Sequence, residues 1–345
     1  MKLIRTQEAV GHVLCHDITQ IIRGVTKDAV FRKGHVVTEE DIPVLLSVGK
    51  EHLYVWEKDE TMMHENEAAR VLYEVCAGND MHPSPVKEGK IELIADRDGL
   101  LKIDRTLLRK INGFGRMMIA SRHGDTPVQR GDKLAGTRII PLVIEKETMQ
   151  AVKDLAGDKR IFHILPYQLK TAGVIATGSE VKKGLIKDTF TPVIIDKLKA
   201  YGIEVKEKAV PGDDPEIITG EILRMADAGL DMILCTGGMS VDPDDRTPLA
   251  IKNSGSRFVS YGAPVLPGAM FLLSYLQRGE REIPVLGLPG CVMYAGRTIF
   301  DLMLPRIAAC DPVSAEEMAA LGEGGLCLNC QVCSWPNCGF GKGHI

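Results

Sequence analysis

The segment 234–245, with the sequence LCTGGMSVDPDD, joins an apolar run to two adjacent glycines and then to three aspartates. Glycines allow backbone N–H groups to approach the oxygens of a phosphate group closely. Carboxylates repel phosphate, but they are oxygen ligands for Mg²⁺, which also binds substrate oxygens and water. The segment therefore predicts a phosphorylated ligand bound together with a divalent cation. The alternative interpretation is that the acids only cap the helix that follows.

Other apolar runs also end in turns that combine glycine with hydroxyl, carboxyl or proline residues. These turns are TGSE at 177–180, PGDD at 211–214, PVLPGAM at 264–270 and LPG at 288–290. Each turn alone has a structural interpretation, since Asp213 and Asp214 before Pro215 suit a helix N-cap. Their common position after apolar runs, rather than any single motif, favours a binding site.

Short apolar segments alternate with helix-like segments between Gly173 and Cys310. We expect strands at 173–177, 203–210, 231–236, 257–263 and 283–288, and helices at 188–202, 213–229, 246–255 and 292–310. This alternation predicts an α/β fold with a doubly wound, mostly parallel sheet, preceded by α+β and small β-rich modules. Because ligands of such sheets bind outside the carboxyl ends of the strands, the glycine-containing turns should share one edge.

These turns and the segments between them resemble the molybdopterin-binding domain of molybdenum-cofactor biosynthesis. The matching stretches are TGSEV, DTFTPVIIDKLKAYGIEV, PGDDPEII, DMILCTGGMSVDPDDRTP, PVLPGAMF and VLGLPGCVMYA. That domain occurs in molybdopterin adenylyltransferases and in molybdopterin molybdenumtransferases. The resemblance implies that the terminal phosphate and pterin of molybdopterin, or of its adenylated form, bind in the cleft at the strand ends.

The resemblance also implies roles for individual residues. In the molybdenumtransferase branch, acids in these turns are implicated with Mg²⁺ in cleaving the adenylate and inserting molybdate. The matching catalytic positions are Glu180, Asp188, Asp213 or Asp214, and Asp245. The matching ligand-binding positions are Thr177, Gly178, Ser179, Thr236, Gly237, Gly238, Ser240, Asp242, Pro267, Gly268, Pro289 and Gly290. The resemblance further implies a homo-oligomer and a molybdoenzyme as a partner.

The chain also departs from the molybdenumtransferase pattern. It lacks a DNSAMDGYA motif, and Cys291 stands after the LPG turn where that family has asparagine. We therefore keep two alternatives to molybdate insertion. One is a non-catalytic carrier, sensor or maturation factor for the cofactor. The other is an enzyme of the related domain group that acts on a different nucleotide phosphate.

Four cysteines occur close to the end of the chain, in the segment GLCLNCQVCSWPNCGFGKG. They are Cys327, Cys330, Cys333 and Cys338, spaced C-x2-C-x2-C-x4-C. Structural zinc sites usually join two C-x2-C pairs across a longer loop, whereas a C-x2-C-x2-C run is typical of iron–sulfur binding. The segment predicts a metal site, and its spacing favours an iron–sulfur cluster over zinc.

Length and composition indicate a globular protein of several domains. The chain has 345 residues, a net charge of −4 and 45% hydrophobic residues, so no basic field favours nucleic acid. No apolar run reaches the roughly 18 residues that a membrane helix needs, and no signal peptide is recognisable. The Walker phosphate loop and the GxGxxG dinucleotide fingerprint are also missing. We expect a cytoplasmic protein without membrane contact.

We expect four parts along the chain. Residues 1–57 contain GHVLCHDI and RKGHVVTEEDIPVLLSVGKEHLYV, which look like fragments of the molybdenumtransferase branch. Residues 58–165 should form a helical and β-rich module that includes a linker, MHPSPVKEG. The α/β domain should occupy 170–312, and the cysteine-rich tail 325–345.

Overall fold

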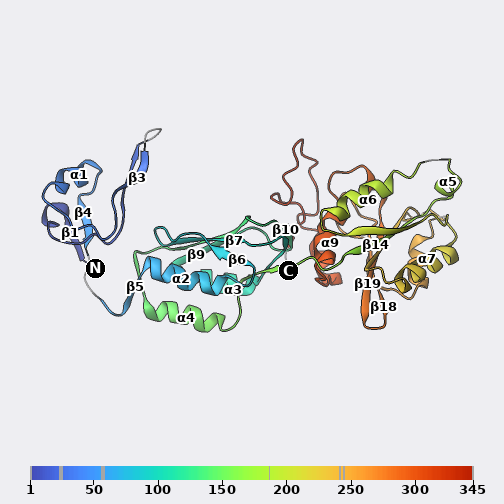
Figure 1. Ribbon diagram of the computed structural model, residues 1–345, viewed down its shortest axis with the longest axis horizontal. Coiled ribbons are helices and arrows are strands. Elements are labelled where there is room, and N and C mark those ends of the chain that lie inside the picture. Colours follow the sequence, from blue (N-terminus) through green and yellow to red (C-terminus); the bar gives the residue numbers. More distant parts are fainter. Residues whose placement is uncertain are drawn as a thin grey trace. The chain divides into compact units, whose positions relative to one another are not determined.

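The computed structural model describes residues 2–22, 26–55, 59–185, 187–240, 242–243 and 245–343. The chain forms two compact units, coloured from blue to red along the chain in Figure 1. Unit 1 consists of residues 1–94, 104–121 and 133–162, and unit 2 of residues 95–103, 122–132 and 163–345. Among the described residues, no helix combines the length and the apolar character that crossing a membrane requires.

The N-terminal part of unit 1 consists of two small antiparallel strand pairs and a short helix. Strand β1 (Lys2–Arg5) pairs with β4 (His52–Val55), and β2 (Ile18–Ile22) pairs with β3 (Thr26–Phe31). The sequence TEEDIPVLLSVG predicts a helix with Thr38 at its N-cap. Helix α1 (Asp41–Ser47) instead has Glu40 at the N-cap, and the Asp41 carboxylate accepts a hydrogen bond from the Thr38 amide at 2.8 Å. The sequence YVWE at 54–57 predicts a strand; Tyr54 and Val55 lie in β4, whereas Trp56 and Glu57 lie outside the described residues.

The remainder of unit 1 combines helices with a four-stranded sheet of order β6-β7-β11-β9. Its strands are β6 (Met81–Pro83), β7 (Lys90–Ala95), β9 (Met117–Ser121) and β11 (Lys133–Ile139), with a separate pair of β5 (Met62–His64) and β12 (Val143–Glu145). Its helices are α2 (Glu65–Cys76), α3 (Arg105–Asn112) and α4 (Lys146–Ala156). The segment 81–89, which the sequence predicts as a linker, is a linker only in part, because residues 81–83 form the edge strand β6. Helices α3 and α4 were not predicted.

His64 joins helix α2 to the N-terminal part of unit 1. Its Nδ1 atom accepts from the Asn66 amide at 3.1 Å, so the proton of the neutral ring lies on Nε2, which is 3.1 Å from the Cys15 carbonyl oxygen. The side chain is buried, and burial lowers its pKa below the ordinary value. The folded state therefore favours the neutral ring.

This environment makes the stability of unit 1 depend on pH. As the pH falls through about 6.5, the unfolded chain takes up a proton at His64 before the folded chain does. We expect the urea midpoint of unfolding to decrease between pH 7.5 and pH 5, and to decrease less in His64→Gln. Parallel urea titrations of both proteins at several pH values test this. Identical pH slopes would show that His64 is not the group responsible.

Unit 2 contains a six-stranded sheet of order β15-β14-β16-β19-β18-β17. Its strands are β14 (Thr171–Ala176), β15 (Glu204–Ala209), β16 (Met232–Thr236), β17 (Arg257–Tyr261), β18 (Leu272–Arg278) and β19 (Arg281–Leu288). Strands β15, β14, β16 and β19 are parallel, and β18 is antiparallel to both of its neighbours. The expected mostly parallel α/β fold is confirmed, whereas the β18–β19 hairpin was not anticipated.

Helices cover both faces of this sheet (Figure 1). They are α6 (Phe190–Lys199), α7 (Pro215–Asp227), α8 (Thr247–Asn253) and α9 (Ile299–Ala308), with short helices α5 (Ser179–Lys182) and α10 (Ala315–Ala320). Alternate strand residues enter different cores: Val174 packs with residues of α6 and α9, and Ile175 with residues of α7 and α8. This two-faced burial explains the uninterrupted apolar strands.

Helix α9 starts later than the sequence indicates. We expected a helix from Val292, but residues Gly290–Met293 form a 3-10 turn and α9 begins at Ile299. The start is set by a capping box, in which the Thr298 side chain and the Asp301 carboxylate satisfy the first amides of the helix. Residues 294–298 therefore remain a loop beside the LPG turn.

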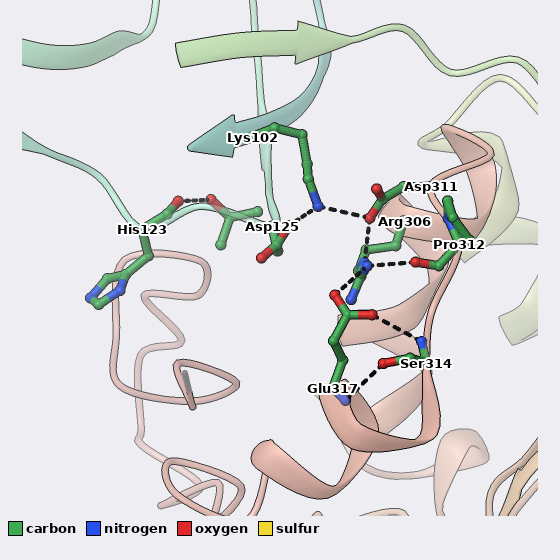
Figure 2. Close-up of polar contacts among 9 residues, drawn as sticks. Lys102, His123, Asp125, Arg306, Asp311, Pro312, Ser314 and Glu317 are labelled. Atoms are coloured by element: carbon green, nitrogen blue, oxygen red, sulfur yellow. Dashed lines mark hydrogen bonds and ion pairs between the residues drawn. The ribbon is translucent and has the colours of Figure 1, made fainter. Parts of the chain in front are cut away.

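A charged network fixes the end of α9 within unit 2 (Figure 2). The Arg306 guanidinium is 7% exposed and donates to Asp311, to Glu317 at 2.9 Å and to the Pro312 carbonyl at 2.8 Å. Lys102 of strand β8 (Gly99–Ile103) donates to Asp311 at 3.0 Å and also to Asp125. The network links the segments 95–103 and 122–132 to α9 and α10.

Candidate functional site

The strand register of unit 2 brings the glycine-containing turns to one edge of the sheet. Ala176 pairs with Thr236, and Thr236 also pairs with Leu288, so the turns that follow these residues begin side by side. Strand β15 ends at Ala209, which pairs with Ile175 one residue before the end of β14. The segment 262–271 lies at the same edge, because it joins the end of β17 to the start of the antiparallel β18. The expectation of a shared edge is confirmed.

The turn after β16 requires its two glycines. Gly237 has a φ of +81°, and a Cβ atom there would lie 2.7 Å from the Thr177 carbonyl oxygen. Gly238 has a φ of +55°, and its Cβ would lie 2.7 Å from the Thr247 hydroxyl. Left-handed backbone and close approach both exclude a side chain. The backbone of this turn is therefore held close to the turn that follows β14, at Thr177.

Buried threonines hold this arrangement. The Thr177 amide donates to the Thr236 carbonyl at 2.8 Å, and its hydroxyl donates to the same oxygen at 3.0 Å. The Thr247 hydroxyl donates to the Gly237 carbonyl at 2.9 Å and lies 3.2 Å from the Thr177 hydroxyl. All three side chains are buried. Thr247 was not anticipated, because in sequence it only marks the start of a helix.

Two of the expected catalytic acids cap helices. The Asp214 carboxylate accepts from the Glu216 amide at 2.9 Å, at the start of α7. The Asp188 carboxylate accepts from the amides of Phe190 and Thr191, each at 3.0 Å, at the start of α6. Both contacts satisfy helix amides that have no partner within the helix. The structural interpretation of these acids therefore holds, and a catalytic role for them stays a prediction.

Asp213 has a different position from its neighbour. Its carboxylate accepts from the Ser179 amide at 2.7 Å and so joins the turn after β15 to the turn after β14. The Lys182 ammonium donates to the Pro211 carbonyl at 2.7 Å and adds a second link between these turns. The sequence left Asp213 and Asp214 as alternatives, and only the fold separates their contacts.

The acids of the third turn lie in a closed loop. The Asp245 carboxylate accepts from the Ser240 amide at 2.7 Å, and the Asp245 amide donates to the Asp242 carbonyl at 2.9 Å. The Asp242 residue is exposed. The side chain of Glu180 and the residues Val241 and Asp244 lie outside the described residues.

No three His, Cys, Asp or Glu side chains of the described residues are placed to hold a metal ion by themselves. Mg²⁺ commonly takes only one or two protein carboxylates and completes its shell with water and substrate oxygens. Asp245 uses Oδ2 in its bond to the Ser240 amide. The donor set at this edge therefore fits a cation that arrives with a phosphorylated ligand better than a resident ion.

The remaining turns meet at the start of α9. Gly268 has a φ of +131°, and a Cβ there would lie 2.4 Å from Ile299 Cγ2. The Ile299 amide donates to the Pro267 carbonyl at 3.2 Å, after a cis Leu266–Pro267 bond. Nothing lies within 4 Å of a Cβ at Gly290, so no steric reason for that glycine is apparent.

Pro289 and Gly290 open the 3-10 turn that carries Cys291. The Cys291 side chain is half-buried, and burial raises the pKa of its thiol. The group is therefore a protonated thiol at neutral pH rather than a thiolate.

The four clustered cysteines lie together in unit 2. Cys327, Cys330, Cys333 and Cys338 all line one cavity of about 400 Å³. None of them forms a disulfide bond. The carbonyl oxygen of Leu266 accepts from the Cys327 amide at 2.8 Å, so this segment contacts the loop that carries Pro267 and Gly268. The sequence contained no indication of that contact.

Comparison with known proteins identifies the α/β part. Residues 173–309 match a family model described as "Probable molybdopterin binding domain", and this part of the chain is a domain of that family. The family is linked to molybdenum-cofactor biosynthesis. Residues 3–57 match a model described as "Domain of unknown function (DUF8806)".

Individual relatives are distant. A CinA-like protein of Mycobacterium avium (strain 104) is 37% identical over 76 residues, which cover 22% of this chain and 18% of that protein. A molybdopterin molybdenumtransferase of Synechococcus elongatus is 27% identical over 198 residues, covering 55% of this chain and 46% of that protein. The chain thus spans about a fifth to about half of the length of these curated relatives.

Similar solved structures share low identity with this chain. The tungsten cofactor synthesizing protein MoaB of Pyrococcus furiosus has a TM-score of 0.32 and 22% identity, covering 36% of this chain and 84% of that one. The molybdopterin biosynthesis enzyme MoaB of Thermus thermophilus has a TM-score of 0.33 and 21% identity, covering 42% of this chain and 99% of that one.

Proposed function

We propose that unit 2 binds molybdopterin, or its adenylated form, at the turns 177–180, 211–214 and 237–246. The supporting observation is that residues 173–309 match the molybdopterin-binding family, and that the most specific turn of this domain accommodates only glycine at 237 and 238. The name of the related molybdenumtransferase agrees with this ligand class.

In this proposal the terminal phosphate accepts hydrogen bonds from backbone amides of the turn that begins at Gly237. Close approach of a phosphate to backbone requires residues without a side chain, which Gly237 and Gly238 satisfy. The ammonium group of Lys182, held by the Pro211 carbonyl, adds positive charge beside the neighbouring turn. The threonine contacts keep the turn in one shape before the ligand arrives, which reduces the entropic cost of binding.

The finer proposal is Mg²⁺-dependent insertion of molybdate into adenylated molybdopterin, with release of the adenylate. Asp245 and Asp242 lie in the third turn and Asp213 joins the first two turns, so three acidic residues lie at the turns to which the proposal assigns the phosphate. The partial likeness to a molybdenumtransferase supports this activity. A molybdoenzyme would then receive the product, and self-association of the α/β domain belongs to the same proposal.

A second candidate is a non-catalytic carrier, sensor or maturation factor that only holds the cofactor. One observation favours it: Asp188, Asp214 and Asp245 each accept hydrogen bonds from backbone amides of their own turns or helices. Acids in such contacts shape the site without taking part in a reaction. Molybdate-dependent release of AMP from adenylated molybdopterin would exclude this candidate, and tight binding without release would support it.

A thermal-shift series separates the ligand classes. The purified chain would be heated with molybdopterin, adenylated molybdopterin, NAD⁺ and AMP, each with and without Mg²⁺. The proposed function requires the pterin ligands to raise the melting temperature at lower concentrations than the nucleotides, since stabilisation follows ligand concentration relative to Kd. A larger effect of NAD⁺ would instead support an enzyme acting on another nucleotide phosphate.

Asp245→Asn separates a cation-binding role from a structural role. The asparagine side-chain oxygen still accepts from the Ser240 amide, so the loop keeps its shape while the negative charge is lost. If Asp245 binds Mg²⁺ with the ligand, we expect the Mg²⁺-dependent part of adenylated-molybdopterin affinity to fall at least tenfold, or about 1.4 kcal/mol. Isothermal titration with and without Mg²⁺ measures this.

The matched control is Asp227→Asn. Asp227 ends helix α7 and pairs with Arg278, which ends β18 next to the β18–β19 turn. This variant removes the same charge without touching the glycine-containing turns. Equal Mg²⁺ dependence in the wild type and Asp245→Asn would assign Asp245 to loop shaping alone.

A further inference from the structure

The cysteine-rich segment is hydrogen-bonded to and packed against the rest of unit 2. The Leu266 amide donates to the Gly325 carbonyl and the Cys327 amide donates to the Leu266 carbonyl, both at 2.8 Å. At the other end of the segment, the Phe340 side chain is buried in the core that contains α6 and α9. Both ends of the cysteine run are therefore fixed.

Close backbone contacts bring these two ends together. The Gly341 amide donates to the Gly324 carbonyl at 3.0 Å. Gly324 has a φ of +78°, and a Cβ there would lie 2.8 Å from the Gly339 carbonyl. The chain between them is a closed loop that carries all four clustered cysteines.

This loop encloses a cavity suited to a metal cluster. The cavity of about 400 Å³ is lined by Cys327, Cys330, Cys333 and Cys338, together with Leu326, Leu328, Trp335 and Phe340. Cys327 and Cys338 pack partly against the core, whereas Cys330 and Cys333 are exposed. Arg297, Asn329 and Ser334 are the polar members of an otherwise apolar lining. Thiolate ligands in a mostly apolar pocket that opens to solvent match the surroundings of protein-bound iron–sulfur clusters.

Trp335 adds an independent observation. Its indole Nε1 is buried and has no hydrogen-bond acceptor within the described part of the chain. The Arg297 guanidinium lies over the indole ring, 4.6 Å from its centre, and holds the ring beside the cysteines. A buried donor without an acceptor is unfavourable. Trp335 lines the cysteine cavity, and sulfide or thiolate sulfur there is the acceptor that the proposal supplies.

We propose that Cys327, Cys330, Cys333 and Cys338 bind an iron–sulfur cluster. A zinc ion requires its thiolates to converge on one point, with Zn–S distances of about 2.3 Å. Among the described residues, no three potential ligands converge in this way, although all four cysteines face one cavity. The C-x2-C-x2-C spacing, together with a single cavity that all four cysteines line, favours a cluster, whose cysteine ligands are distributed over several iron atoms.

The position of the cysteine loop couples the cluster to ligand binding at the neighbouring turns. The backbone amide of Cys327 donates a hydrogen bond to the carbonyl oxygen of Leu266, which directly precedes Pro267 and Gly268. Arg297, which stacks on Trp335, lies in the loop between the LPG turn and α9. The cysteine loop therefore contacts the turn 264–270 and, through Trp335 and Arg297, the loop that follows the LPG turn. The sequence predicts further ligand-binding positions in these two turns, at Pro267, Gly268, Pro289 and Gly290. Ligand binding should change the environment of the cluster, and this coupling rests on the proposed function, whereas the cluster does not.

The cluster is tested on the 345-residue chain, purified without oxygen and reconstituted with ferrous iron and sulfide. The expected product is brown, contains iron and acid-labile sulfide, and loses visible absorption on reduction. Cys330→Ala and Cys333→Ala should lose most of the iron, and Cys310→Ala, an exposed cysteine outside the loop, should retain it. Circular dichroism melts of the variants without iron confirm that they are folded.

Two results would overturn the cluster: a colourless protein that retains zinc in the presence of excess iron and sulfide, or equal iron content in Cys330→Ala and Cys310→Ala. The coupling has its own readout, the visible and paramagnetic resonance spectra of the cluster with and without molybdopterin. Binding of molybdopterin without any spectral change would overturn the coupling alone. An intact cluster in a protein that binds no molybdopterin would contradict the proposed function and leave the cluster standing.

Discussion

Gly237→Ala is expected to weaken molybdopterin binding by at least a hundredfold, about 2.7 kcal/mol. Alanine at a φ of +81° costs about 1–2 kcal/mol, and its Cβ would lie 2.7 Å from the Thr177 carbonyl. That oxygen belongs to the backbone and cannot rotate away, so the whole turn must shift. The amides that we assign to the phosphate then move with it, and binding is lost together with some stability.

Gly220→Ala is the matched control. Gly220 lies inside helix α7 and has no atom within 4 Å of a Cβ position. Alanine there should stabilise the protein by about 0.5–1 kcal/mol and leave binding unchanged. Ligand titration and urea unfolding of both variants give the comparison. Wild-type affinity in Gly237→Ala would mean that the ligand phosphate binds elsewhere.

Arg306→Ala is expected to destabilise unit 2 by about 3–5 kcal/mol, the usual effect of breaking a buried ion pair from one side. The Arg306 side chain is 7% exposed and donates to Asp311, Glu317 and the Pro312 carbonyl, as Figure 2 shows. Its removal leaves Asp311, 11% exposed, with only part of its positive surroundings. Helix α10, which carries Glu317, should then detach first and expose the cysteine-rich loop.

Two controls accompany this variant. Arg224→Ala removes an exposed arginine that pairs with Glu207 and with Glu221 on α7, and it should change the midpoint of urea unfolding little. Arg306→Lys keeps the charge but not the planar set of donors, so an intermediate loss is expected. Limited proteolysis of α10 identifies the detached segment. Equal stability of Arg306→Ala and Arg224→Ala would show that the network contributes nothing.

Acid should weaken the same network. Glu317 is partly buried, which by itself disfavours its charge, but the Ser314 amide and Arg306 hold the pKa of its carboxyl below the usual value. A lowered folded-state pKa contributes stability above the unfolded pKa of about 4.3 and loses it as the pH falls through the folded value. The difference between Arg306→Ala and the wild type should therefore shrink in acid.

Local sequence rules were sufficient for most of the α/β domain. The order of strands and helices could be inferred because caps and helix stops, such as Asp214 with Pro215, act within a few residues. The shared edge of the turns followed from parallel strand order, which depends only on alternation along the chain. Strand β18 was missed because its burial on both faces leaves no period of two to distinguish it from a helix.

The roles of the acids required the fold. Asp213 and Asp214 are neighbours of identical chemistry, yet one accepts from Ser179 across two turns and the other caps its own helix. The difference depends on where residue 179 lies, and contacts between residues 34 positions apart have no local sequence pattern.

By itself, the sequence determined the mostly parallel α/β domain, and it predicted phosphate-binding turns and a four-cysteine metal site, because each of these depends on residues close together in the chain. Only the tertiary structure showed that the cysteine loop is hydrogen-bonded through its backbone to Leu266, in the turn that contains Gly268. That contact is made by backbone N–H and C=O groups, which nearly every residue carries, so side-chain identity does not encode it. The folding of the core around Phe340 and α9 brings the two segments together.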